Sequence, residues 1–256
     1  VCPVPIAFDY KTDDEDINKI LRAAHETFIQ NSFDLFTDCP TRERAGWLCD
    51  SFFLGRAEKF YTGKNLIEKN FLENYLLLDN YENIPDGMIP MCYPADVDSG
   101  GFIPNWAMWF ILELRDFSYR TGDSDFILLF RDKVYRLIGW FECFENADGL
   151  LERLPGWVFI EWSKANDFVQ DINFPSNMLY SAALSAAGEL FEDEKLKQKS
   201  EKLREIIRER SFDGEFFRDN EVYNKDGVPS ATENRTETCQ YYAFFSGVAT
   251  SELYPE

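Results

Sequence analysis

Apolar residues recur at helical spacing along most of the chain. Pro3 and Pro5 predict an extended segment over residues 1–12, since proline disfavours helix. Acidic residues at 13–16 suit a helix N-terminus, and the apolar spacing after them predicts a helix to about residue 30. The same spacing predicts helices at about 46–61, 65–80, 105–121, 124–145, 177–191 and 193–210, a short hairpin at 215–224, and a last helix from about 237.

The predicted helices differ in how far their apolar surface extends. The segment 105–121 is apolar nearly all round, which is typical of a buried inner helix, whereas 193–210 is strongly charged, as in an outer, solvated one. Long irregular segments at 83–104 and 150–175 separate helices, and loops of this length are usually functional. The pattern favours an all-α fold with two layers of helices closed into a barrel. A non-barrel helical array is the alternative.

Composition excludes several classes of partner. Asp and Glu number 46 against 26 Lys and Arg, and the resulting net charge of −20 repels nucleic acids and anionic membranes. No apolar run approaches the length of a membrane span. The six cysteines form no CxxC pair and only one histidine is present, so we expect no zinc site and mainly buried thiols.

Chemically reactive side chains concentrate between residues 38 and 50. Three carboxylates, two guanidinium groups and an indole occur there: Asp38, Glu43, Asp50, Arg42, Arg44 and Trp47. Charged groups can hold sugar hydroxyls, and apolar sugar faces stack on indole. If the helix extends back to residue 43, then Glu43, Trp47 and Asp50 lie along one face. On spacing alone, however, a capped helix start with surface ion pairs is the favoured interpretation of the cluster.

The run Asp38-Cys39-Pro40, with Arg42-Glu43-Arg44, Gly46-Trp47 and Asp50, resembles the signature of bacterial α-L-rhamnosidases, glycoside hydrolase family 78. The catalytic domain of that family is an (α/α)6 barrel. Two positions depart from the pattern. Many members have a further acidic residue between the arginine and the catalytic glutamate, whereas Arg42 and Glu43 are adjacent here, and Cys49 stands where many members have glycine.

This resemblance implies hydrolysis of a terminal α-L-rhamnoside with inversion, with no metal or organic cofactor. Glu43 would be the general acid. Asp38, Arg42 and Asp50 would hold the sugar hydroxyls, and Trp47 would line the pocket. In the family, the general base is a glutamate 250 or more residues after the acid, which would fall beyond Glu256. We therefore expect residues 13–256 to form a partial barrel, incomplete at the C-terminus and inactive or nearly so alone.

Two further tryptophans are candidates for the sugar pocket. Trp106 begins the apolar helix after the first long loop, and Trp162 lies in the second long loop, about where family members place a pocket tryptophan. Trp109 is expected in the core, and His25 is expected to be structural. The acidic residues of the long loops are expected to be solvated: Asp96, Asp98, Asp167 and Asp171.

Three functions remain open from the sequence. The resemblance favours an enzyme acting on a rhamnose-containing glycoside or oligosaccharide in the bacterial cytoplasm or periplasm. The alternatives are another (α/α)6-barrel glycosidase with a different sugar specificity and a non-catalytic, carbohydrate-binding barrel. The oligomeric state does not follow from the sequence.

Overall fold

The computed structural model describes residues 7, 10–94 and 100–254. Most of the expected extended segment over residues 1–12 lies outside this part, as do Asp96 and Asp98. The helices are α1 (Glu15–Gln30), α2 (Asp50–Thr62), α3 (Leu66–Asn74), α4 (Pro104–Thr121), α5 (Ser124–Leu128), α6 (Arg131–Glu142), the 3-10 helix η1 (Lys164–Phe168), α7 (Phe174–Leu190), α8 (Glu194–Ser211) and α9 (Glu237–Ser246). The strands β1 (Ile172–Asn173), β2 (Asn220–Tyr223) and β3 (Pro229–Ala231) form a small antiparallel sheet in that order.

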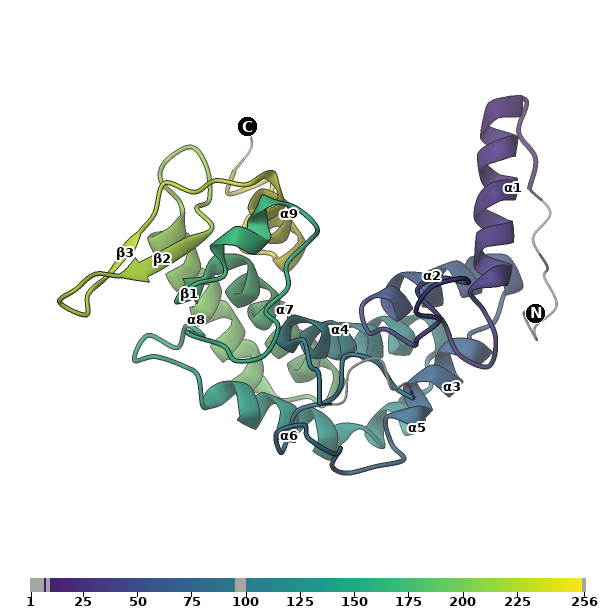
Figure 1. The fold of residues 1–256 in the computed structure, drawn as a ribbon, viewed down its shortest axis with the longest axis horizontal. Coiled ribbons are helices and arrows are strands. Elements are labelled where there is room, and N and C mark those ends of the chain that lie inside the picture. The colour runs from purple at the N-terminus through teal and green to yellow at the C-terminus, as the bar shows by residue number, and fades with distance from the viewer. Residues whose placement is uncertain (1–6, 8–9, 95–99, 255–256) are drawn as a thin grey trace.

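The helices follow one another along an arc, with α1 at one end and the β2–β3 hairpin at the other (Figure 1). Helix α7 packs against α4, α8 and α9, while α2 packs against α3 and α4. The core therefore runs continuously through α2, α4 and α7, the central helices of the arc. The prediction of an all-α fold is confirmed.

The contrast between inner and outer helices is also confirmed. Helix α4 begins at Pro104, whose fixed φ suits a first helical position, and ends at Gly122 in the left-handed conformation. Most of its residues are buried, including Trp109, which was expected in the core. Asp193 caps the start of helix α8, since its carboxylate accepts hydrogen bonds from two backbone N–H groups. It buries only a narrow stripe of residues, as an outer helix does.

Two predicted helices are shorter or broken. The helix expected over 65–80 ends at Asn74, after which the backbone continues through i→i+3 hydrogen bonds of 2.9–3.1 Å up to Leu77. Leu77 and Leu78 are exposed, so no burial favours further helix. The helix expected over 124–145 is divided into α5 and α6, because Leu129 and Phe130 also form i→i+3 bonds.

The hairpin expected at 215–224 lies further along the chain, where β2 pairs with β3. Its turn is built around Asn224, whose side-chain oxygen accepts hydrogen bonds from the N–H groups of Asp226 and Val228. Gly227 supplies the positive φ that the turn needs. Within the described residues, all five cysteines are free, and two of them, Cys92 and Cys239, are buried. No helix in this part of the chain is long and apolar enough to cross a membrane.

Candidate active site

The segment before α2 is not helical, so the prediction of a helix from residue 46 is wrong. Helix α2 begins at Asp50, and the preceding backbone pairs with a distant loop. The Leu48 N–H donates to the Met91 carbonyl at 2.9 Å, and Trp47 forms an antiparallel bridge with Cys92. Glu43, Trp47 and Asp50 therefore do not share a helix face. Their side chains meet because the backbone turns.

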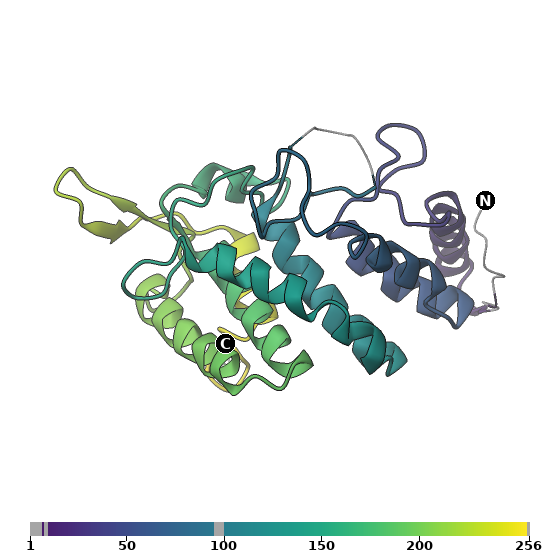
Figure 2. The ribbon, with the colours of Figure 1, turned by 90° about the horizontal axis from the view of Figure 1, so that it is seen from below.

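One cavity of about 480 Å³ brings the predicted site residues together. One wall comes from the segment before α2 and its first residue, and the other comes from α4 and the loop before α7. Its lining residues are Asp38, Cys39, Arg42, Glu43, Trp47, Asp50, Ile103, Trp106, Trp157, Phe159 and Trp162. The loops that precede α2 and α4 lie on the same side of the helices (Figure 2).

All seven residues expected at the site line this cavity, although they are up to 124 positions apart, from Asp38 to Trp162. Four lining residues were not predicted as site residues: Cys39, Ile103, Trp157 and Phe159. The signal that could have found Trp157 is its place in the same loop as Trp162. Cys39 lies within the signature itself, whereas Ile103 and Phe159 carry no such signal in the sequence.

The second wall of the cavity is aromatic. Phe159 joins two tryptophans, with its ring centre 5.0 Å from that of Trp106 and 4.9 Å from that of Trp162, both in edge-to-face geometry. Trp157 contacts Trp162 at 6.1 Å. Trp106 is 9% exposed and Trp162 79% exposed, so the wall runs from the core to the surface. Such a wall suits a ligand with an apolar face.

The opposite wall carries interacting charges. The Nε of Arg42 lies 2.6 Å from Oε1 of Glu43, and the Cys39 thiol donates to Oε2 at 3.5 Å. The Glu43 interaction raises the pKa of Arg42. Burial acts to raise the pKa of Asp38, but hydrogen bonds from Glu43, Cys39 and the Ala45 N–H together hold that pKa below its ordinary value.

Asp50 has the most perturbed carboxyl group on this wall. Burial raises its pKa to about 6, and the negative charges of Asp38 and Glu43 add to the effect. A carboxyl group with this pKa changes its charge close to physiological pH.

Asp38, Cys39 and Glu43 also offer oxygen and sulfur atoms that all lie within 4.8 Å of one another, as metal ligands do. The guanidinium of Arg42 already places a positive charge beside this group, however. The residues therefore fit an arginine–carboxylate cluster as well as they fit a metal site, and nothing else in their geometry favours a metal.

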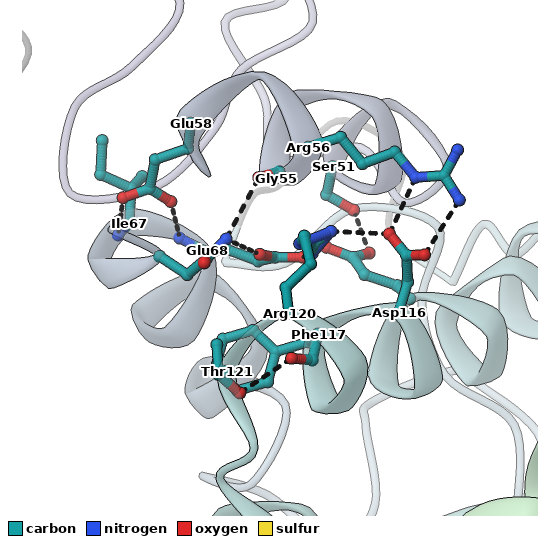
Figure 3. A network of polar contacts seen from close by, with 12 residues as sticks. Ser51, Gly55, Arg56, Glu58, Ile67, Glu68, Asp116, Phe117, Arg120 and Thr121 are labelled. Atoms are coloured by element: carbon teal, nitrogen blue, oxygen red, sulfur yellow. Dashed lines mark hydrogen bonds and ion pairs between the residues drawn. The ribbon is translucent and has the colours of Figure 1, made fainter. Parts of the chain in front are cut away.

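A network of polar contacts joins α2, α3 and α4 next to Asp50 (Figure 3). The Ser51 hydroxyl, next to Asp50, donates to the buried carboxyl group of Glu113 on α4 at 2.6 Å. Arg120 on α4 pairs with Glu68 on α3 and with Asp116 on α4.

The Glu58 carboxylate on α2 completes this network at the start of α3. It accepts the backbone N–H groups of residues 66, 67 and 68 at 2.8–2.9 Å, which caps the N-terminus of α3. Helices α2, α3 and α4 are thus fixed to one another by buried polar contacts.

Solved structures with a similar fold include glycoside hydrolases. A family 78 rhamnosidase of Bacillus sp. GL1 matches 99% of this chain with a TM-score of 0.80 and 22% identity, over 26% of its own length. A rhamnosidase from Klebsiella oxytoca with rhamnose bound matches 96% of the chain with a TM-score of 0.76 and 18% identity, over 47% of its length. A family 105 glycoside hydrolase of C. acetobutylicum matches 91% with a TM-score of 0.57 and 13% identity, over 72% of its length.

The chain thus spans about a quarter to a half of the rhamnosidase structures it matches. No curated protein matches it. The model of the bacterial α-L-rhamnosidase six-hairpin glycosidase domain matches residues 7–254. The expected (α/α)6 type of fold and the resemblance noted from the signature are confirmed, and the chain belongs to the bacterial α-L-rhamnosidase six-hairpin glycosidase family.

Proposed function

We propose that this chain forms the sugar-binding and proton-donating part of a glycoside hydrolase that releases terminal α-L-rhamnose with inversion. One observation carries the proposal: the seven residues that the signature and the tryptophan positions pick out line a single cavity. The likeness to a rhamnosidase with rhamnose bound supports the choice of sugar.

The two walls of the cavity suit the two faces of a deoxy-sugar. Asp38, Arg42 and Asp50 hold the ring hydroxyls, since charged groups form the stronger hydrogen bonds in a partly dry site. The aromatic wall and Trp47 cover the less polar face and the methyl group. The reaction as proposed uses no metal or organic cofactor.

Glu43 donates the proton to the leaving oxygen. Its carboxyl group lines the cavity, where Oε1 lies 2.6 Å from Nε of Arg42 and Oε2 accepts from the Cys39 thiol at 3.5 Å. General acid catalysis of this kind contributes about 10²–10⁴-fold to the rate.

The general base comes from outside residues 1–256. Inversion needs a second carboxylate about 6.5–9.5 Å from the acid, on the opposite face of the sugar. The three carboxylates that line the cavity all come from residues 38–50, and the facing wall is aromatic. Within the described residues, Glu161 is an alternative, because it adjoins the lining residue Trp162 in the loop before α7.

The first experiment measures release of p-nitrophenol from p-nitrophenyl α-L-rhamnopyranoside, with the α-D-glucoside as control, by this chain and by a form extended at its C-terminus. We expect hydrolysis of the rhamnoside alone, by the extended form alone. Activity of residues 1–256 that is lost in Glu161→Gln would identify Glu161 as the base. Hydrolysis of only another glycoside would favour a different sugar specificity, and rhamnose binding without hydrolysis would favour a binding barrel.

A further inference from the structure

Two residues at the base of one loop adopt a backbone conformation that favours glycine. Arg153 has a φ of 50° and Asp171 a φ of 46°, both in the left-handed region. Non-glycine residues there cost free energy and persist only where surrounding contacts hold them, often near functional sites. Neither lies in a regular helix or strand.

The two residues bind each other. The Arg153 N–H donates to the Asp171 carbonyl at 2.8 Å, and the Arg153 Nε donates to Oδ1 of Asp171 at 3.1 Å. Sequence analysis expected Asp171 to be a solvated loop acid. Instead, its side chain is 24% exposed and paired.

A second set of contacts fixes this pair to the small sheet. Oδ2 of Asp171 accepts the backbone N–H of Tyr223 on β2 at 3.0 Å. The guanidinium of Arg153 lies 4.5 Å from the centre of the Tyr223 ring, whose hydroxyl bonds to Glu152. Both carboxylate oxygens of Asp171 are therefore in use.

The pair closes the segment 154–170, which we call the aromatic loop. This loop supplies Trp157, Phe159 and Trp162 to the cavity wall. Further hydrogen bonds join its backbone to the rest of the protein: the Trp157 N–H donates to the Phe102 carbonyl at 3.1 Å, the Tyr242 hydroxyl to the Ile160 carbonyl at 3.2 Å, and the Asn173 side chain to the Phe168 carbonyl at 2.9 Å. Within the loop, the Ile160 N–H donates to the Asn166 side chain at 2.8 Å. The position of the aromatic wall thus depends on these contacts together with the way the loop is held at its base.

Global stability does not explain the pair. The Arg153 side chain is 62% exposed, and ion pairs this exposed add little to stability. The strained backbone at both residues opposes even that small gain. What the contacts do is to fix the direction in which the chain leaves and rejoins the helical body.

We propose that Arg153 and Asp171 form a clasp that positions the aromatic loop against the sugar pocket, and that both are positioning residues for sugar binding without touching the sugar. The effect on binding rests on the proposed function, whereas the effect on the loop does not.

The variant Asp171→Gly tests the clasp, since glycine suits the φ but removes both acceptors. The matched control is Glu192→Gly, because Glu192 has a φ of 54° in the turn between α7 and α8, away from the pocket. Hydrogen exchange is followed at the N–H groups of Trp157 and Ile160, with Ile111 in α4 as reference. We expect about ten-fold faster exchange at the two loop positions in Asp171→Gly only, a sign of local opening. Unchanged exchange, or equal acceleration at Ile111, would overturn the clasp.

The second readout is the hydrolysis of p-nitrophenyl α-L-rhamnopyranoside by the protein in its full length. Asp171→Gly should raise KM about ten-fold with kcat within about two-fold, because the loop binds the sugar but does not react. The KM of Asp171→Asn, which keeps one side-chain acceptor, should lie between the KM of Asp171→Gly and that of the unchanged protein. Faster loop exchange with an unchanged KM would refute the positioning role. If no form hydrolyses the rhamnoside, the proposed function fails, and the exchange data still decide on the clasp.

Discussion

Gly55 on α2 faces the carboxyl group of Glu68 on α3 with no room for a side chain, because a Cβ at residue 55 would overlap that group. Burial raises the pKa of Glu68 to about 7, partly opposed by Arg120. The Asn65 side chain donates both to the Gly55 carbonyl at 3.2 Å and to Glu68 at 2.8 Å. Glycine is therefore required here for the close approach of two helices around a buried ion pair.

Gly55→Ala should destabilise the domain by about 1–3 kcal/mol, since the new methyl group displaces a buried, hydrogen-bonded carboxyl group. Urea unfolding measures the change. The control is Gly139→Ala on α6, where no atom lies within 4 Å of the added Cβ and the usual helix preference should stabilise by about 0.5–1 kcal/mol. If the two substitutions changed the free energy of unfolding equally, the close contact between residue 55 and Glu68 would not affect stability.

The sequence predicted the composition of the site better than its geometry. The residue types between Asp38 and Asp50 pointed to sugar chemistry, and those residues do meet in one cavity. Their predicted arrangement on a helix face was wrong because the Leu48 N–H pairs with Met91, which is 43 positions away. Periodicity within a short window cannot show such a partner.

The inner helix α4 was predictable for the opposite reason, because its apolar pattern is local and continuous. The aromatic wall was only half predictable. Trp162 could be inferred from the family, whereas Phe159 reaches the cavity through the irregular loop that the contact between Arg153 and Asp171 closes. Neither Arg153 nor Asp171 belongs to a sequence pattern that predicts a backbone with positive φ.

Cys49 provides a test of backbone strain beside the site. Its φ of 74° and ψ of −49° favour glycine, which many family members have at this position. Cys49→Gly should therefore be more stable than Cys49→Ala by about 1 kcal/mol, since both lose the thiol but only alanine keeps the strain. Thermal and urea unfolding of the two variants measure the difference.

Ala57 within α2 supplies the comparison for Cys49. At that position the φ is helical, so Ala57→Gly should lower the free energy of unfolding by about 1 kcal/mol, because alanine is normally more favourable than glycine inside a helix. If Cys49→Ala proved at least as stable as Cys49→Gly, the positive φ at residue 49 would carry no cost.

Asp50 should make stability depend on pH. Its folded pKa of about 6 lies above the ordinary value of 3.8, so its contribution to stability is fully present below pH 3.8 and is lost as the pH rises through about 6. Asp50→Asn removes the buried charge and should stabilise the domain at pH 7.5 by roughly 1–3 kcal/mol. Urea unfolding at pH 7.5 and pH 4.5 should show a smaller gain at the lower pH.

The same substitution should weaken rhamnose binding, because Asp50 is proposed to hold a sugar hydroxyl. A gain in stability together with a loss of binding is expected where a buried charge is needed for function but lowers stability. A gain of the same size at both pH values would mean that the Asp50 carboxyl does not titrate as described.

Glu43→Gln tests the proton donor directly. Glutamine keeps the size and the contact with Arg42 through its carbonyl oxygen but carries no acidic proton. Hydrolysis of p-nitrophenyl α-L-rhamnopyranoside by the full-length protein should fall about 10²–10⁴-fold. Rhamnose affinity, measured by calorimetry, should change little.

The matched control is Glu161→Gln, which alters a neighbouring carboxylate and should leave hydrolysis unchanged if the base lies outside this chain. Undiminished hydrolysis by Glu43→Gln would remove Glu43 from the role of acid and direct attention to Asp50, whose pKa of about 6 also permits a proton near neutral pH.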